Sequence, residues 1–346
     1  MDVLLVKLSS LGDVVHTLPA ITDAARAHPG IGIDWIIEDA YRPVAALHSA
    51  VRNVVPIGIR AFRRAPTREW RRLRASIAAL RSRNYDVAID AQGLAKSALV
   101  GALARANGIC GYDSRSAREP IAASLYRRRF SVARDRHAVE RVRALFAQAL
   151  GYPPPTSPPD FGIAEGSEGP LTPLDGIALL HGTTWPNKRW PDAFWRALAE
   201  RAARRGLDVI VPASGDAERA LAERIAQAHA RVRVLPPLPL DALVRELARV
   251  RAAVSVDSGL GQLSAALGVP TIALYGPTDP KLTGCVGAHA TNVAASFPCA
   301  PCKKRGCAYR GAPVLDDDIE HGRAVEPPCF STVSVDAVFA RLERVL

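Results

Sequence analysis

Residues 3–15 read VLLVKLSSLGDVV, a short apolar run followed by a small polar turn and then by further apolar residues. The run from Val3 to Leu8 is typical of a buried β-strand, and the pattern after Asp13 predicts a helix that begins near Val14. Strands that turn directly into helices build α/β folds, whose ligands bind at the carboxyl ends of the strands. Asp13 is therefore predicted to lie at the rim of a parallel sheet.

The same alternation of short β-branched runs with Ala-, Leu- and Arg-rich helical patterns continues along the whole chain. It predicts an α/β protein with doubly wound parallel sheets that are covered by helices on both faces. We expect strands over 3–8, 31–37, 54–59, 87–90 and 109–112, and then over 177–181, 209–211, 232–235, 253–256 and 271–275. The clearest helical spacing covers 192–205, 216–229 and 240–251.

The length of 346 residues predicts two domains, because it exceeds what one core comfortably covers. Residues 151–175 are rich in proline, which is typical of a stiff, extended connection. We therefore expect a first domain over 1–155, a linker over 156–175, a second domain over 176–332 and a terminal helix over 333–346.

The net charge of +11 favours an anionic partner or surface. A basic protein prefers nucleic acids, phosphorylated small molecules or anionic membranes, and the abundance of Arg suits bidentate binding of phosphate or carboxylate. No apolar run reaches the ~20 residues of a membrane span. The apolar start is interrupted at Lys7, Ser9 and Ser10, unlike a signal peptide. We expect a cytoplasmic protein whose cysteines are reduced.

Several nucleotide and hydrolase motifs are missing from the sequence. There is neither a G-x-x-x-x-G-K-[ST] loop nor a G-x-S-x-G elbow. The glycines at 259 and 261 begin a dinucleotide fingerprint, but Ser264 stands where its last glycine belongs. These absences disfavour a P-loop enzyme, an α/β-hydrolase and a nicotinamide oxidoreductase.

Asp13 is the leading candidate for a general base. Its carboxylate has an equally plausible structural role as a helix cap, since Asp is a preferred capping residue. The neighbouring Ser9, Ser10 and Gly12 favour function, because small polar residues leave room for a ligand close to the backbone.

Two polar turns in the second half are candidates for phosphate binding. The first, HGTTWPNKRWP over residues 181–191, brings together Thr183, Thr184 and Lys188 just before a helix, although it could be a solvated loop. The second, at Asp257, Ser258 and Gly259, offers amides to a phosphate and a carboxylate to sugar hydroxyls, or else only a helix cap.

Arginines crowd residues 60–74, where a solvated helix face and a nucleic-acid surface are both open interpretations. No nucleic-acid module is recognisable. The cysteines Cys299, Cys302, Cys307 and Cys329 have the spacing C-x2-C-x4-C-x21-C, a weak zinc signal because only one pair is close. The alternative is a proline-rich loop with buried free thiols, and Cys110 and Cys285 are expected in the core.

The chain resembles the lipopolysaccharide heptosyltransferases of glycosyltransferase family 9, and within them the heptosyltransferase I branch. The resemblance covers essentially the whole chain. It rests on residues 6–19, 90–97, 117–120, 137–141, 188–191, 255–260 and 275–280.

This resemblance implies a GT-B fold, in which two Rossmann-like domains face each other across a cleft, with the terminal helix packing back on the first domain. It implies transfer of L-glycero-D-manno-heptose from ADP-heptose to the first Kdo of Kdo2-lipid A, with inversion, without cofactor or metal, and without nucleic acid. A peripheral position on the cytoplasmic face of the inner membrane follows for the enzyme.

The resemblance also assigns roles to residues of this chain. Asp13 is implied as the base, and Lys188 as the cation that stabilises the leaving ADP. The implied donor site comprises Ser9, Ser10, Gly12, Thr183, Thr184, Lys188, Asp257, Ser258, Gly259 and Gln262. The implied acceptor site comprises Arg60, Arg63, Arg64, Lys96 and Arg118.

Gln262 departs from the family, which usually has His at this position. A glutamine donates a neutral hydrogen bond but carries no charge, so the donor preference stays open. Heptosyltransferase II, or another ADP-sugar transferase of the same family, is the alternative function. A nucleotide- or RNA-binding regulatory protein without catalysis is the alternative outside enzymes.

Overall fold

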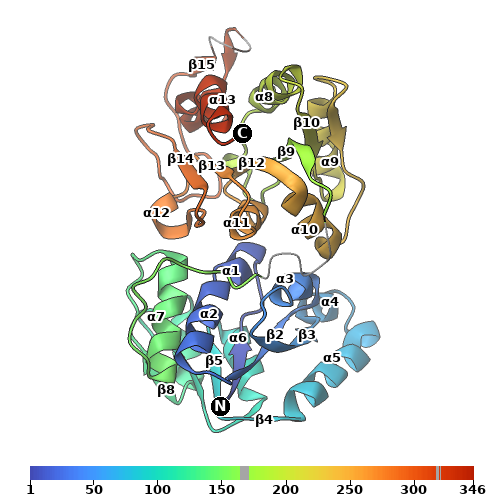
Figure 1. The fold of residues 1–346 in the computed structure, drawn as a ribbon. Helices are drawn as coiled ribbons and strands as arrows, with labels where there is room; N and C mark the ends of the chain where they lie inside the picture. Colours follow the sequence, from blue (N-terminus) through green and yellow to red (C-terminus); the bar gives the residue numbers. More distant parts are fainter. Residues whose placement is uncertain (164–170, 317–318, 320) are drawn as a thin grey trace. The chain divides into compact units, whose positions relative to one another are not determined.

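The computed structural model describes residues 1–163, 171–316, 319 and 321–346. The chain divides into two compact units, Met1–Ser167 and Glu168–Leu346, and the division falls inside the segment predicted as a linker. Each unit has its own six-stranded parallel sheet with helices around it (Figure 1).

The sheet of the first unit has the strand order β3-β2-β1-β5-β7-β8, and all its neighbouring strands are parallel. Taken in chain order this is 3-2-1-4-5-6, the order of dinucleotide-binding Rossmann sheets. The strands are β1 (Asp2–Val6), β2 (Gly32–Glu38), β3 (Val51–Ile57), β5 (Val87–Asp90), β7 (Ile109–Tyr112) and β8 (Arg128–Phe130).

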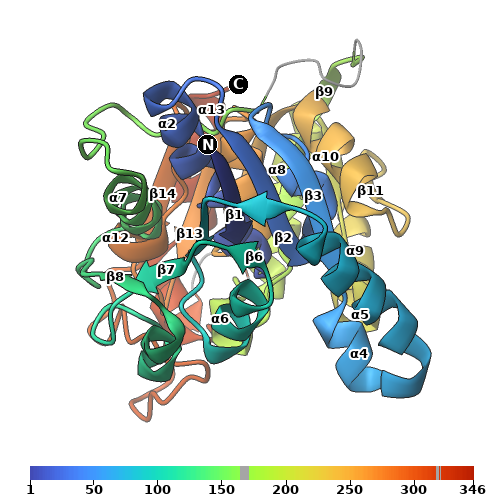
Figure 2. The same cartoon turned by 90° about the horizontal axis from the view of Figure 1, so that it is seen from below.

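The helices of the first unit are α1 (Leu11–Val15), α2 (Leu18–Ala27), α3 (Arg42–Ala45), α4 (Ile59–Arg64), α5 (Pro66–Arg81), α6 (Ala95–Ala102) and α7 (Ala138–Leu150), with 3₁₀ turns η1 (Asp39–Tyr41) and η2 (Pro120–Leu125). A small sheet joins β4 (Asn84–Tyr85) to β6 (Arg105–Ala106). The helix α5 lies beside the edge strand β3 and extends away from the sheet (Figure 2).

The sheet of the second unit repeats the same topology, with the order β11-β10-β9-β12-β13-β14. Its strands are β9 (Leu174–Leu180), β10 (Asp208–Val211), β11 (Val232–Val234), β12 (Val250–Val256), β13 (Thr271–Tyr275) and β14 (Ala290–Ala294). The helices are α8 (Asp192–Arg204), α9 (Gly215–Ala226), α10 (Leu240–Arg249), α11 (Gly259–Ala266), α12 (Pro280–Thr283) and α13 (Val335–Glu343), with η3 (Pro186–Lys188), η4 (Pro328–Thr332) and the pair β15 (Leu315–Asp316) and β16 (Arg323–Ala324).

The central strands are buried on both faces, as the continuous apolar runs predicted. Residues 3–6 of β1 and 177–179 of β9 are fully buried, because helices cover both sides of a parallel sheet. Tryptophans are the largest fully buried side chains in the two cores. In the first unit Trp35 donates its indole N–H to the carbonyl of Lys7 over 3.0 Å, and in the second Trp190 donates to that of Val333 over 2.9 Å.

Several predicted element boundaries are corrected by the structure. The strand expected over 3–8 ends at Val6, the one over 54–59 ends at Ile57, and the helix over 240–251 ends at Arg249 because the chain enters β12 there. The edge strands β8 and β14 were not predicted. Neither RRF nor ATNVA contains a continuous β-branched run.

The terminal helix α13 belongs to the second unit. Its buried residues Val335, Val338 and Leu342 join the core around Trp190 and Trp195, and α13 packs on α8. The apolar face of residues 333–346 thus packs within the second unit, and the expected contact of this segment with the first domain stays a prediction.

Candidate active site

The first group of polar residues lies where β1 and β5 end side by side in the first unit. Here the strand order reverses, the position at which open α/β sheets bind ligands. The backbone N–H and the hydroxyl of Ser10 each donate to Oδ2 of Asp13 over 3.0 Å. Ser10 is therefore the N-cap of α1, and Asp13 lies in the first turn and completes a capping box. This corrects the expectation that Asp13 itself is the N-cap of a helix beginning near Val14.

Two cations flank the Asp13 carboxylate. The Nζ atom of Lys7 is 3.7 Å from Oδ1, and Nη1 of Arg118 is 3.7 Å from Oδ2. Burial alone would raise the pKa of Asp13, but Lys7 and Arg118, with the Ser10 amide, hold that pKa at about 2. Burial, in turn, lowers the pKa of Lys7. The carboxylate is therefore ionised across the physiological pH range and is 22% exposed.

Basic side chains predicted to bind the acceptor occupy the same edge of this sheet. The backbone N–H of Arg60 donates to Glu38 over 3.3 Å, and its guanidinium donates to the Tyr41 hydroxyl over 3.2 Å. Burial raises the pKa of Glu38, although Arg60 and Lys96 oppose the shift. Arg63 and Arg64 are exposed on α4.

The second group lies at the equivalent reversal of strand order in the second unit, where β9 and β12 end side by side. The Nζ atom of Lys188 is 2.6 Å from Oδ2 of Asp257, and it lies 4.6 Å from the centre of the Trp185 ring. The Thr183 hydroxyl donates to the carbonyl of Asp257 over 3.4 Å. The two predicted phosphate turns are therefore brought together by one ion pair.

The remaining predicted donor residues fall in two places. Thr184, Ser258, Gly259 and Gln262 lie in the turn after β9 or at the start of α11, whereas Ser9, Ser10 and Gly12 lie beside Asp13 in the first unit. Ser258 caps α11, because its hydroxyl accepts from the N–H of Gly261 over 3.3 Å. Gln262 is buried and donates to the Thr283 carbonyl over 2.7 Å, so this amide already has a partner. Thr184 is exposed.

His181, which opens the turn, is buried, and burial lowers its pKa to about 4. The imidazole is therefore neutral at physiological pH.

The cysteines of the weak zinc pattern line one cavity of about 260 Å³ in the second unit. All are free, and only Cys329 is buried, in contrast to the expected buried thiols. Within the described residues, no three His, Cys, Asp or Glu side chains are placed to hold a metal ion. Cys110 and Cys285 are buried in the core as predicted.

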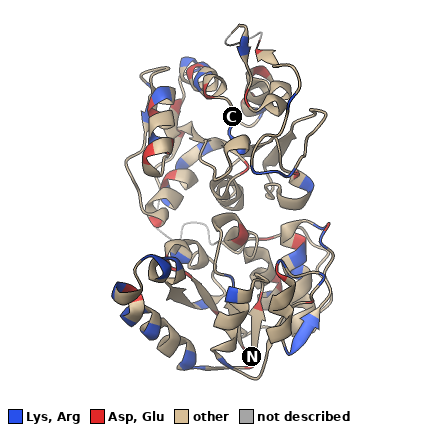
Figure 3. Cartoon of the chain, turned by 180° about the vertical axis from the view of Figure 1, so that it is seen from behind, with Lys and Arg blue, Asp and Glu red and all other residues tan. Residues whose placement is uncertain are grey.

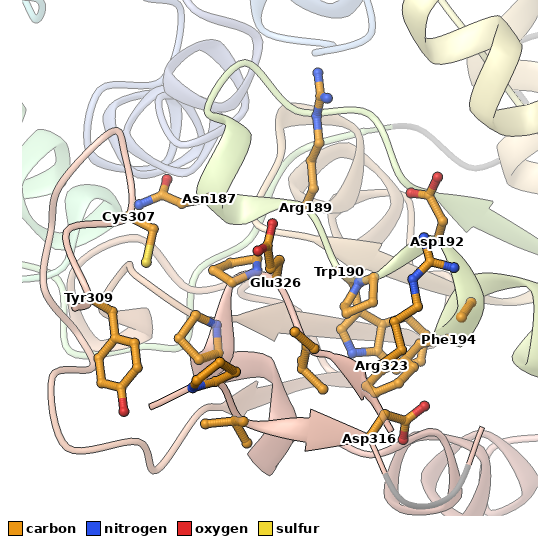
Figure 4. A pocket seen from close by; sticks show the side chains of 18 of the residues that line it. Asn187, Arg189, Trp190, Asp192, Phe194, Cys307, Tyr309, Asp316, Arg323 and Glu326 are labelled. Carbon is orange, nitrogen blue, oxygen red and sulfur yellow. The ribbon is translucent and has the colours of Figure 1, made fainter. Parts of the chain in front are cut away.

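A larger cavity of about 1010 Å³ lies in the second unit between the start of α8 and the segment that follows Cys307 (Figure 4). Its lining includes Asn187, Asp192 and Arg323. None of the predicted donor-binding residues lines it. The cavity is therefore separate from the Lys188–Asp257 pair.

Sequence reasoning named most of these side chains but not their partners. From the sequence, Lys7 is noticeable only as an interruption of the apolar start, and neither Trp185 nor Tyr41 stands out as a site residue. Lys7 could have been found from its place at the end of a strand next to Asp13, because the carboxyl ends of parallel strands gather polar side chains.

Comparison with known proteins identifies the family of the chain. The profile of glycosyltransferase family 9 (heptosyltransferase) matches residues 73–312. Lipopolysaccharide heptosyltransferase 1 of Pseudomonas aeruginosa is 45% identical over 353 aligned residues, covering 100% of this chain and 98% of that protein.

Two solved structures of the Escherichia coli heptosyltransferase WaaC are also similar. One contains ADP and has a TM-score of 0.85, and the other contains ADP-2-deoxy-2-fluoro heptose and has a TM-score of 0.82. Each is 37% identical and covers 100% of both chains. These matches confirm the predicted α/β GT-B fold class. The chain belongs to glycosyltransferase family 9 and is a heptosyltransferase.

Proposed function

We propose that this enzyme transfers L-glycero-D-manno-heptose from ADP-heptose to the first Kdo of Kdo2-lipid A, with inversion and without a metal ion. The observation that carries the proposal is the ionised, partly open Asp13 carboxylate at the switch point of the first sheet. The high identity to heptosyltransferase 1 over the whole chain favours this function over heptosyltransferase II.

Asp13 acts as the general base in this proposal. The acceptor hydroxyl attacks the anomeric carbon of the heptose, the bond from that carbon to the phosphate oxygen breaks, and ADP leaves with the electron pair. The hydroxyl proton passes to Asp13. A carboxylate with a pKa of about 2 is a weak base, so the proton moves late, when bond formation has made the hydroxyl acidic.

Lys188 stabilises the leaving diphosphate. The negative charge on ADP grows as the glycosidic bond breaks, and a preorganised cation stabilises that charge without magnesium. Since Lys188 is paired with Asp257 over 2.6 Å, the diphosphate must take over this ammonium or share it. The released Asp257 carboxylate then accepts hydrogen bonds from the donor, and Thr183, Thr184 and the amides at the start of α11 complete the site.

The acceptor is bound by the cations of the first unit. The proposed set comprises Arg60, Arg63, Arg64, Lys96 and Arg118. Kdo carries a carboxylate and lipid A carries phosphates, both of which suit Arg. Arg118 also touches Asp13, so an acceptor carboxylate bound there would lie beside the base.

The enzyme contacts the anionic surface of the inner membrane through α4 and α5. Arginines are concentrated on this helix pair (Figure 3). Trp70 on α5 is 51% exposed, and the single buried residue of that helix is Leu80. Among the described helices, none is long and apolar enough to cross a bilayer. A basic helix with an exposed Trp is suited to the lipid–water interface.

The proposal is tested by mixing purified enzyme with ADP-heptose and Kdo2-lipid A in metal-free buffer, and by following ADP release and product mass. We expect a product heavier by one heptose, formed rapidly by the native enzyme and about 10²–10⁴-fold more slowly by Asp13→Asn. ADP binding without any transfer would contradict the assignment of acceptor or donor, and equal transfer by Asp13→Asn would exclude Asp13 as the base.

A further inference from the structure

Gln92 binds the backbone that leads from β1 to the Asp13 turn. Its Oε1 atom accepts hydrogen bonds from the N–H groups of Leu8, over 2.6 Å, and Ser9, over 3.3 Å. Its Nε2 atom donates to the carbonyl of Ser9 over 2.8 Å. The buried side chain thus continues the hydrogen bonding between β1 and β5 beyond the end of both strands.

Gln92 is itself held firmly in place. Oδ1 of Asp90 accepts from the N–H groups of Gln92, over 2.8 Å, and Gly93, over 3.2 Å. Oδ2 of Asp90 accepts from the hydroxyls of Ser97 and Tyr126, each over 2.7 Å. A fully buried carboxylate with four donors is a rigid anchor, because any displacement leaves buried polar groups unsatisfied.

The turn after Gln92 requires a glycine. Gly93 has a φ of +68°, and a Cβ there would lie 3.3 Å from the backbone nitrogen of Arg118. Because Gly93 has no side chain, its backbone can lie close to the backbone of Arg118, whose guanidinium flanks Asp13.

The loop after β5 reaches two of the groups that hold the Asp13 carboxylate, Ser10 and Lys7. Gln92 fixes Ser9, and the next residue, Ser10, donates twice to Asp13. The carbonyl of Ala91 accepts from Nζ of Lys7 over 3.0 Å, which orients this ammonium 3.7 Å from Asp13.

We propose that Gln92 is a positioning residue for the transfer reaction, which sets the Asp13 carboxylate through the Leu8–Ser10 backbone without touching either substrate. This inference rests on the proposed role of Asp13 as the base. A base displaced by about 1 Å loses on the order of 100-fold in rate. The groups proposed to hold the diphosphate, Lys188 and the amides at the start of α11, belong to the other unit, so the affinity for ADP itself should not depend on Gln92.

The first test replaces Gln92 by Met, which has a similar size but neither donates nor accepts strongly. We expect kcat to fall by about 10- to 100-fold, with the Kd for ADP unchanged. Gln148→Met is the matched control, because Gln148 is exposed on α7 of the same unit, and it should keep native kcat. Native kcat in Gln92→Met would overturn the inference.

A double-mutant cycle then separates positioning from general damage. In the Asp13→Asn background, Gln92→Met should lower the residual kcat less than 3-fold, because no base is left to misplace. An equal fall in both backgrounds would overturn the inference. Full turnover by Asp13→Asn alone would instead overturn the proposed function, so the two failures are distinguishable.

Gln92→Glu provides a second readout if the Met variant folds poorly. Glu keeps an oxygen that accepts from Leu8 and Ser9, but it cannot donate to the Ser9 carbonyl. Its added negative charge near Lys7 and Asp13 should raise the pKa of Asp13 and move the acid limb of kcat/KM to higher pH. An unchanged acid limb with native kcat would contradict the inference.

Discussion

The turns after β1 and β9 occupy the same place in two sheets of the same topology, yet they hold opposite charges. In the first unit a carboxylate, Asp13, is flanked by two cations that are each 3.7 Å away. In the second a cation, Lys188, is paired with one carboxylate 2.6 Å away. The topology decides where a ligand site forms, and the side chains of the turn decide which charge it presents.

The opposite charges of the two turns correspond to two requirements of the proposed transfer step. Accepting a proton from a hydroxyl needs a carboxylate that stays ionised, and stabilising a leaving diphosphate needs a cation. If this division of labour is correct, changes in the first turn should alter turnover, and changes in the second should alter the use of the donor.

The largest effect is expected for Asp13→Asn, which removes the base and keeps the size of the side chain. Its kcat should fall by about 10²–10⁴-fold. Steady-state ADP release measures this, with the melting temperature as the check on folding. Turnover within a few-fold of native would contradict the assignment of the base to the turn after β1.

The next effect in size is expected for Lys188→Ala. Loss of the cation should lower kcat/KM for ADP-heptose by about 10²–10³-fold, because the charge on the leaving group is no longer stabilised. Arg204→Ala serves as the control, since Arg204 is an exposed cation of the same unit that pairs with Glu200 on α8. Unchanged donor kinetics in Lys188→Ala would remove it from the site.

A smaller effect of opposite sign is expected for the binding of ADP to Asp257→Asn. The substitution removes the carboxylate that competes with the diphosphate for Lys188, so the affinity for ADP itself should rise several-fold while transfer becomes slower. Calorimetric titration with ADP measures the change. Weaker ADP binding would show that Asp257 contributes to the diphosphate site rather than competing with it.

The smallest effect is the pH response of Arg118→Ala. A lowered pKa of about 2 keeps Asp13 ionised, so native kcat/KM should show no acid limb between pH 7 and pH 5. Removing Arg118 takes away a cation that lowers this pKa, so the limb must move to higher pH. A limb that stays in place, measured at pH values where the protein is folded, would show that Arg118 does not act on Asp13.

Much of the fold could be predicted from the sequence, because buried parallel strands are continuous apolar runs. The strands β5, β7 and β13 have the predicted bounds. The edge strands β8 and β14 could not be found in the same way, because RRF and ATNVA are recognisable as strands only through their pairing with β7 and β13.

The site residues, too, could be predicted only in part. Asp13, Lys188 and Asp257 could be named because each follows a strand in a polar turn. Their partners could not, since the Lys188–Asp257 pair and the contacts of Gln92 with Leu8 and Ser9 join segments far apart in the chain. Local patterns indicate which side chains are polar and exposed, whereas strand order decides which of them meet.

The most direct test of the division of labour is the Kd for ADP of the native enzyme, Asp13→Asn and Lys188→Ala, measured by calorimetry alongside kcat. The two turns predict opposite patterns for the two variants. Asp13→Asn should bind ADP like the native enzyme but turn over about 10²–10⁴-fold more slowly, and Lys188→Ala should bind ADP more weakly. Weakened ADP binding in Asp13→Asn, or native ADP binding in Lys188→Ala, would contradict this division of labour.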